Sequence, residues 1–339
     1  MIRHPIIFRL ALAASALALV VVVLGAWVRL SDAGLGCPDW PGCYGHIGVP
    51  DEAHELAAAN AAYPQRPVEA GKAWKEMIHR YAASILGLLI VAIAVLAWRA
   101  ARRGEGVGKL PYALLALVVF QGLLGMWTVT LLVKPIIVLA HLAGGLSTLA
   151  LLWWLVLRHA SLGDGQPAPT RLRGPALAAL LVLVLQILLG GWTSTNYAAL
   201  SCPDLPTCQG QWWPQMDFAD GFTPWRGLGV DYEGGVLANE SRVAIHVAHR
   251  LGAIAAAPLV GLLALLAWRS GGAARPVGAL IGVLLLLQLA LGLGNVLFSL
   301  PLAVATAHNG GAALLLLSLL SLLHLLYPAK MRRLPGGKP

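Results

Sequence analysis

The sequence predicts an all-α polytopic membrane protein in which eight transmembrane helices form two pseudo-twofold-related four-helix bundles. The composition is the first reason: 58% of the residues are hydrophobic and 12% are charged, about half the charged share of a soluble domain. The second is a series of eight apolar runs, each about the 20 residues that cross a bilayer as a helix. Because the runs are too long for barrel strands, helices must satisfy the backbone in lipid.

The apolar runs follow one another along most of the chain, and connections of very different length separate them. Their approximate bounds are 8–29, 76–98, 111–132, 136–157, 175–196, 243–268, 277–298 and 302–326. The first run is longer than the apolar core of a cleaved signal peptide, so we expect it to be retained as a span.

The net charge of +9 follows the predicted topology. With the N-terminus inside, the cytoplasmic segments hold most of the 24 Lys and Arg residues and only two acids, Glu105 and Asp164. This positive-inside bias sets the orientation and places both termini in the cytoplasm. It also accounts for the charge without a nucleic-acid partner.

The chain contains an internal repeat. CPDWPGC at 37–43 returns as CPDLPTC at 202–208, 165 residues later, and QGLLG at 121–125 returns as QLALG at 288–292. Each copy therefore holds four spans, and we expect an N-terminal repeat at 1–160 and a C-terminal repeat at 161–339, joined by a cytoplasmic linker. Because four is even, the repeats are expected to be parallel, related by an axis along the membrane normal.

Both copies of the heptapeptide fall on the outer side of the predicted topology, where thiols are oxidised. Cys37 with Cys43, and Cys202 with Cys208, can each close a short disulfide loop. A four-thiolate metal site is the rival, although C-x5-C is a poor zinc spacing. Pairing across the two loops stays open too, since four cysteines allow three connectivities.

Four histidines share one depth in the predicted bundle, near the outer ends of the even-numbered spans. They are His79, His141, His249 and His308. His141 follows Pro135 by six residues and His308 follows Pro301 by seven, and both prolines are expected helix starts. Ser241, as an N-cap, would place His249 at the same level. With a rise of about 1.5 Å per residue, all four lie about 10 Å below the outer surface.

Two imidazoles that face each other across a bundle are typical axial ligands of haem iron. Gly144 and Gly145 follow His141, and small residues there would let a flat macrocycle approach the helix. Two alternatives stay open: polar histidines that only bond between helices, and a metal ion without porphyrin, for which few carboxylates are at hand.

Charged neighbours distinguish the two halves. Arg80 and Arg250 each follow a predicted ligand and suit a haem propionate, unless they only reach toward outer headgroups. Glu76 lies one turn before His79 and could handle protons, or could be an interfacial acid paired with a nearby cation. His246 takes that place one turn before His249, where we expect it to support the ligand rather than bind iron.

The ordered set of motifs resembles the haem A synthase family. EMIHR at 76–80 is similar to the Glu-x-x-His-Arg signature that opens helix 2 in that family. The family also has eight spans in two repeats, one histidine on each even-numbered helix, and cysteine pairs in the first and third outer loops. The resemblance covers roughly residues 10–326.

The resemblance implies an oxidoreductase that converts haem O to haem A for cytochrome oxidase by oxidising a methyl group to a formyl group. It implies a substrate haem between His79 and His141, with Glu76 as the catalytic group, and a permanent haem b between His249 and His308. Cys37 and Cys43 would be the functional outer-loop pair, and Cys202 and Cys208 the second disulfide. A gapless offset of 167 would match His79 with His246 instead, so the choice between His246 and His249 stays open.

The expected partners are haem O, haem O synthase, an electron donor and membrane lipid, with a homo-oligomer left open. The expected location is the bacterial inner membrane, with the cysteine loops in the periplasm. Segment 51–62 is expected to form a short helix over the first site. The rival function is a dihaem b-type cytochrome that carries electrons from quinol; a transporter is less favoured, because the polar residues lie near the outer face rather than mid-membrane.

Overall fold

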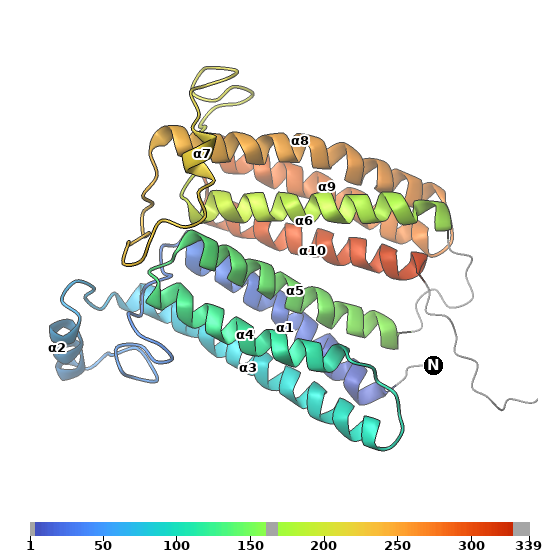
Figure 1. Ribbon diagram of the computed structural model, residues 1–339, viewed down its shortest axis with the longest axis horizontal. Helices are drawn as coiled ribbons and strands as arrows, with labels where there is room; N and C mark the ends of the chain where they lie inside the picture. Colours follow the sequence, from blue (N-terminus) through green and yellow to red (C-terminus); the bar gives the residue numbers. More distant parts are fainter. Residues whose placement is uncertain (1–3, 161–168, 328–339) are drawn as a thin grey trace, which may run out of the picture.

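Eight long helices form the body of the protein in the computed structural model, which describes residues 4–160 and 169–327 (Figure 1). Each is long and apolar enough to cross a membrane, which confirms the predicted multi-pass helical fold. They are α1 (Pro5–Leu30), α3 (Ala70–Arg102), α4 (Leu110–Thr130), α5 (Pro135–His159), α6 (Arg173–Thr195), α8 (Asn239–Arg269), α9 (Ala274–Leu297) and α10 (Leu302–Leu326). Three short elements accompany them: α2 (Ala53–Ala62), the 3₁₀ turn η1 (Thr170–Leu172) and α7 (Phe218–Gly221).

Two of the long helices begin well before their apolar runs. α3 starts at Ala70 and α8 at Asn239, because polar first turns extend each helix beyond the bilayer-spanning stretch. The prediction that Ser241 caps α8 is wrong: the N-cap is Ala238. The Ser241 hydroxyl instead donates to Oδ2 of Asp220 at 2.6 Å and so ties α8 to α7.

The long helices pack as two groups of four. α1, α3, α4 and α5 lie together, α6, α8, α9 and α10 lie beside them, and α1 and α5 meet α10 and α6 where the groups join (Figure 1). In this core Ala11, Ala14 and Ala18 of α1 are almost fully buried, and small side chains of this kind let helices approach closely. The pseudo-twofold relation between the two groups stays a prediction.

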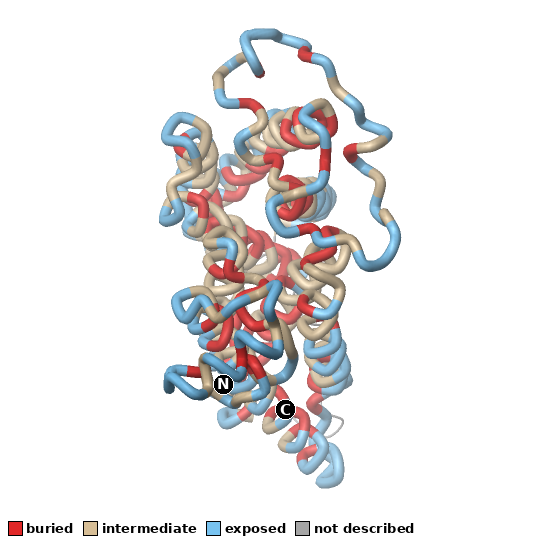
Figure 2. Tube along the Cα trace, turned by 90° about the vertical axis from the view of Figure 1, so that its left-hand side faces the viewer, coloured by how far each residue is buried: buried red, intermediate tan, exposed pale blue. Residues whose placement is uncertain are grey.

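Both long loops lie at one end of the helix bundle. Residues 31–69 join α1 to α3, and residues 196–238 join α6 to α8. Viewed from this end, the loops are mostly exposed and the buried segments gather between the helices (Figure 2). The expected helix at 51–62 is confirmed as α2, which lies beyond the ends of the long helices, and its place over the first site stays a prediction (Figure 1). Segments 161–168 and 328–339, which contain part of the predicted linker and the C-terminal basic residues, lie outside the described residues.

Candidate functional site

His79 of α3 and His141 of α5 face each other inside the N-terminal group of helices. Their ring centroids are 6.5 Å apart and their planes make an angle of 79°. Because metal–imidazole bonds are about 2 Å long, two imidazoles on opposite sides of one metal ion have centroids about 6 Å apart. The pair therefore has the spacing of two axial ligands to a single iron.

Each of the four predicted ligands lies against a glycine of a neighbouring helix. If each glycine carried a Cβ atom, that atom would lie close to Cε1 of the histidine ring. The distance would be 3.1 Å between Gly25 and His79 and 3.5 Å between Gly125 and His141. It would be 3.0 Å between Gly190 and His249 and 3.2 Å between Gly292 and His308. The rings consequently point between helices rather than into lipid. Glycine keeps the space beside each ring free of side-chain atoms.

Buried ring nitrogens support a binding role for these histidines. Nδ1 of His79, His141 and His308 is buried, with no hydrogen-bond partner among the described residues. Buried polar atoms are normally satisfied, so such atoms call for a ligand or a missing partner. No group of three or more His, Cys, Asp or Glu side chains that could hold a bare metal ion occurs in the described ranges. Paired imidazoles of this kind fit haem iron.

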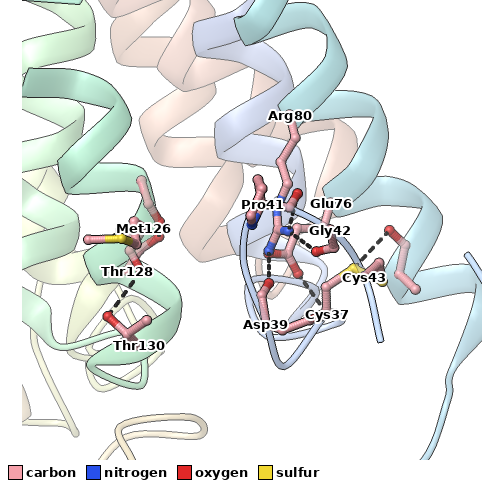
Figure 3. Close-up of polar contacts among 12 residues, drawn as sticks. Cys37, Asp39, Pro41, Gly42, Cys43, Glu76, Arg80, Met126, Thr128 and Thr130 are labelled. Atoms are coloured by element: carbon pink, nitrogen blue, oxygen red, sulfur yellow. Dashed lines mark hydrogen bonds and ion pairs between the residues drawn. A yellow bond between two sulfur atoms is a disulfide. The ribbon is translucent and has the colours of Figure 1, made fainter. Parts of the chain in front are cut away.

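Glu76 is a buried carboxylate that joins the first cysteine loop to the helix of His79 (Figure 3). Its side chain is 6% exposed. Oε1 accepts a hydrogen bond from Nη2 of Arg80 at 2.5 Å, and Oε2 accepts one from the backbone N–H of Cys37 at 2.9 Å. Arg80 is thus the nearby cation that pairs with Glu76, while Lys72 pairs with Glu69 at 3.1 Å.

Arg80 and Arg250 hold the two cysteine loops in the same way. Arg80 donates to the carbonyl oxygens of Asp39, Pro41 and Gly42 at 3.1, 3.2 and 2.5 Å (Figure 3). Arg250 donates to those of Cys202, Asp204 and Thr207 at 2.7, 2.9 and 2.8 Å. These contacts were missed in the sequence, although both the heptapeptide and the His-Arg dyad occur once in each half. Binding of haem propionates by these arginines stays a prediction.

The cysteines form two local disulfides. The Sγ atoms of Cys37 and Cys43 are 2.02 Å apart, and those of Cys202 and Cys208 are 1.97 Å apart. Local pairing is thus confirmed, whereas pairing across the loops and a four-thiolate metal site are excluded. In the second loop, hydrogen bonds from the Thr207 hydroxyl and the backbone of Gly210 hold the pKa of Asp204 below its usual value.

The second half differs from the first at the residue one turn before its ligand. His246 is buried, and its Nδ1 lies 2.9 Å from the carbonyl oxygen of Ala198. This contact fixes the ring against the loop that follows α6. His249 instead lies against Gly190 of α6, just as His79 lies against Gly25 of α1; we call these ring-contacting glycines the cradle. The arrangement favours His249 as the ligand and His246 as a supporting residue.

An eight-helix membrane protein with paired imidazoles near one end of its bundle is the class that the fold and the site define. A family model described as cytochrome oxidase assembly protein matches residues 8–320, and the chain belongs to this family. The Heme A synthase of Shewanella oneidensis is 48% identical to it over 311 residues, which cover 91% of this chain and 93% of that protein. The Heme A synthases of Rhizorhabdus wittichii and Methylobacterium radiotolerans are each 30% identical, over 88% and 87% of this chain and 88% and 83% of theirs.

Proposed function

We propose that this protein is a haem A synthase, an oxidoreductase that converts a methyl group of haem O to the formyl group of haem A for cytochrome oxidase. The observation that carries the proposal is the His79–His141 pair, 6.5 Å between ring centroids, with the buried carboxylate of Glu76 one turn from His79. The names of the relatives, and the length over which they match, support the same activity.

The two halves take different roles in this proposal. The N-terminal half, 1–160, binds the substrate haem between His79 and His141, and the C-terminal half, 161–339, holds haem b between His249 and His308. A bound haem supplies the iron for oxidation and electron transfer. The asymmetry between Glu76 and His246 supports this division, because a carboxylate can take up or release a proton beside the reacting edge of the substrate.

The residues around Glu76 shape the reacting half. Arg80 and the N–H of Cys37 occupy both carboxylate oxygens and fix the orientation of the group. The disulfide loop 37–43, held by Arg80, covers this end of α3 and keeps water from the carboxylate. We therefore assign Glu76 the proton-handling role, and we assign Arg80 the positioning of both Glu76 and the loop.

The proposal also includes a location and partners. The positive-inside bias supports an inner-membrane protein with cytoplasmic termini and periplasmic cysteine loops. Haem O arrives from its synthase, and a separate electron donor serves haem b. Parallel repeats related along the membrane normal would place the two haems at one depth, near the periplasmic face.

The test is expression in cells that make haem O, followed by extraction and mass analysis of the haems. The wild-type protein should yield haem A. Glu76→Gln and His79→Ala should abolish this product while the b-type spectrum stays, because neither residue touches the C-terminal pair. His249→Ala or His308→Ala should lose that spectrum.

The same preparation distinguishes the rival function. A dihaem electron carrier would retain two equivalent b haems and make no haem A, and this result would overturn the synthase assignment. A synthase holds one haem firmly and a second that exchanges.

A further inference from the structure

A glutamine recurs one turn before three of the four glycines that cradle the histidines. The pairs are Gln121 with Gly125 on α4, Gln186 with Gly190 on α6, and Gln288 with Gly292 on α9. On the facing helices a glycine follows the histidine by three residues in the same three cases. These glycines are Gly144 on α5, Gly252 on α8 and Gly311 on α10.

The three glutamine amides reach the neighbouring histidines. Nε2 of Gln186 donates to the carbonyl oxygen of His249 at 3.0 Å and lies 3.1 Å from Nδ1 of the same ring. Nε2 of Gln121 donates to the carbonyl oxygen of His141 at 3.0 Å. Nε2 of Gln288 lies 3.3 Å from Nε2 of the His308 ring. An amide thus sits beside each of these histidines.

The glycines on the facing helices make room for the amides. A Cβ at Gly144, Gly252 or Gly311 would collide with Oε1 of the glutamine opposite. Glutamine and glycine therefore work as one unit in each helix pair, and replacing either affects the other.

The glutamines and the histidines both have buried polar atoms without a hydrogen-bond partner. Oε1 of Gln121, Gln186 and Gln288 is buried without a partner in the described part of the chain, and so is Nδ1 of His141 and His308. At His249 the Gln186 amide lies beside Nδ1, and turning the amide by 180° would let Oε1 accept Nδ1–H in place of the bond to the carbonyl oxygen, which leaves Nε2 for iron. Gln121 reaches only the carbonyl oxygen of His141, and Gln288 lies beside Nε2 of His308, so these two amides hold the backbone and the edge of the ring.

The helix pair of α1 and α3 breaks the pattern. Val21 stands one turn before Gly25, where a glutamine is expected, and Ala82 stands three residues after His79, where a glycine is expected. Val21 presents its backbone to the His79 ring and has no amide to offer. His79 is thus the one predicted ligand that lacks a glutamine beside it.

We propose that Gln121, Gln186 and Gln288 are positioning residues that hold His141, His249 and His308 as iron ligands, while His79, which has the Val21 backbone but no glutamine amide beside it, is held less firmly and can release its haem. The inference rests on the proposed function, in which the N-terminal haem must arrive and leave as substrate and product. Partners of this kind change metal affinity about 10- to 100-fold. Exchange of the N-terminal haem then requires only that one of its two ligands is weak. The missing glutamine makes His79 the weaker ligand.

Carbon monoxide uptake by the reduced, purified protein tests the inference. A haem with two imidazole ligands takes up the gas only when one imidazole leaves, so the uptake rate reports ligand release. In the wild-type protein the N-terminal haem should react faster than haem b. Val21→Gln combined with Ala82→Gly completes the missing pattern and should slow the N-terminal haem about 10-fold. Gln186→Leu should accelerate haem b by a similar factor and make its midpoint potential more positive.

Matched variants control for packing. Val21→Leu with Ala82→Gly adds similar volume without an amide and should keep the wild-type rate. Gln186→Glu retains an acceptor and should restore slow uptake by haem b. Leu185→Val changes a side chain that is 52% exposed on α6 and should leave both rates unchanged.

The outcomes separate this inference from the function it rests on. Equal uptake rates in the completed and the leucine-bearing N-terminal variants, with both haems bound, would overturn the inference alone. If Gln186→Leu fails to fold, the N-terminal comparison still decides, since its two variants share Ala82→Gly and differ only in whether residue 21 carries an amide. A wild-type protein that binds no haem between His249 and His308 would overturn the proposed function itself.

Discussion

Arg80 joins parts of the N-terminal half through one guanidinium group. It contacts Glu76 on its own helix and the carbonyl oxygens of the loop that carries Cys37 and Cys43. The group is buried enough that its hydrogen bonds are not replaced by water, since its side chain is 13% exposed. Arg250 does the same for the second loop but has no carboxylate one turn away. Loop anchoring is common to both halves, and the link to a buried carboxylate belongs to the first.

Replacing the two arginines one at a time separates their effects. Arg80→Ala removes several charge-assisted hydrogen bonds to the first loop, so a phosphine reductant should reach Cys37–Cys43 about 10-fold faster, while Cys202–Cys208 keeps its rate. Arg250→Ala should reverse this selectivity. Thiol labelling followed by peptide mass analysis measures both rates in one sample. Equal acceleration of both disulfides by either variant would show general loosening rather than local anchoring.

How well the helix ends near the sites could be predicted depended on whether the sequence marks them with a particular residue. α5 and α10 begin at or just after Pro135 and Pro301, as expected, because proline marks a helix start. The extra polar turns of α3 and α8 were not predicted. A hydropathy pattern detects only the apolar part of a helix, and these two helices continue beyond it. The facing of His79 and His141 agreed with their equal depth, but the glycine beside each ring became visible only when the helices were packed.

The cradle glycines make a graded prediction. Alanine at Gly190 or Gly25 would place Cβ 3.0 or 3.1 Å from the ring of a histidine, which must then shift, so haem content should fall severalfold in the affected half. Alanine at Gly125 would lie 3.5 Å from His141, an ordinary contact, and should be tolerated. The pyridine haemochrome ratio of haem to protein measures the effect.

Gly87 on α3 serves as the control for the cradle series. A Cβ there meets no atom within 4 Å, so Gly87→Ala should keep the full haem content and, through better helix propensity, the same or a higher melting temperature. Loss of haem in this variant as well would mean that alanine harms these helices in general and that the cradle has no special role.

The two halves also meet outside the bundle, where the N-terminal half contacts the long loop that follows α6. Lys134, between α4 and α5, donates to the carbonyl oxygen of Gly227 and lies 3.4 Å from the centroid of Trp225. Burial lowers the pKa of this lysine. Arg66 reaches Asp231 at 2.6 Å on the same loop, in a more exposed setting. The loop that follows α6 is thus held by the N-terminal half as well as by its own helices.

These loop contacts should differ in strength. Lys134→Ala removes a buried contact and should expose the segment around Trp225 to rapid proteolysis. Arg66→Ala removes two exposed ion pairs, with Asp231 and Glu233, each worth about 0–1 kcal/mol, and should raise the cleavage rate much less. Limited proteolysis in detergent, with fragments identified by mass, gives the comparison. Equal rates in the two variants would mean that the lysine is no better an anchor than a surface pair.

At the scale of the whole molecule, span number and repeat were predictable because lipid imposes length and duplication preserves motif spacing. The joining of the two groups was not predictable, since the helices that meet there, α1 and α5 with α6 and α10, have ordinary apolar sequences. Each predicted iron site nevertheless draws both ligands from one group: His79 and His141 from the first, His249 and His308 from the second. The halves can therefore be tested as binding units.

Co-expression of 1–160 and 161–339 as separate chains should give a complex that keeps its b-type spectrum, because no ligand of the C-terminal pair crosses the break. The packing of α5 and α1 against α6 and α10 should hold the two chains together through purification on a tag carried by one of them. His249→Ala in the second chain is the control and should remove the spectrum without separating the chains. If the intact pair associates but binds no haem b, the C-terminal site needs a continuous chain, and the division of labour between the halves fails.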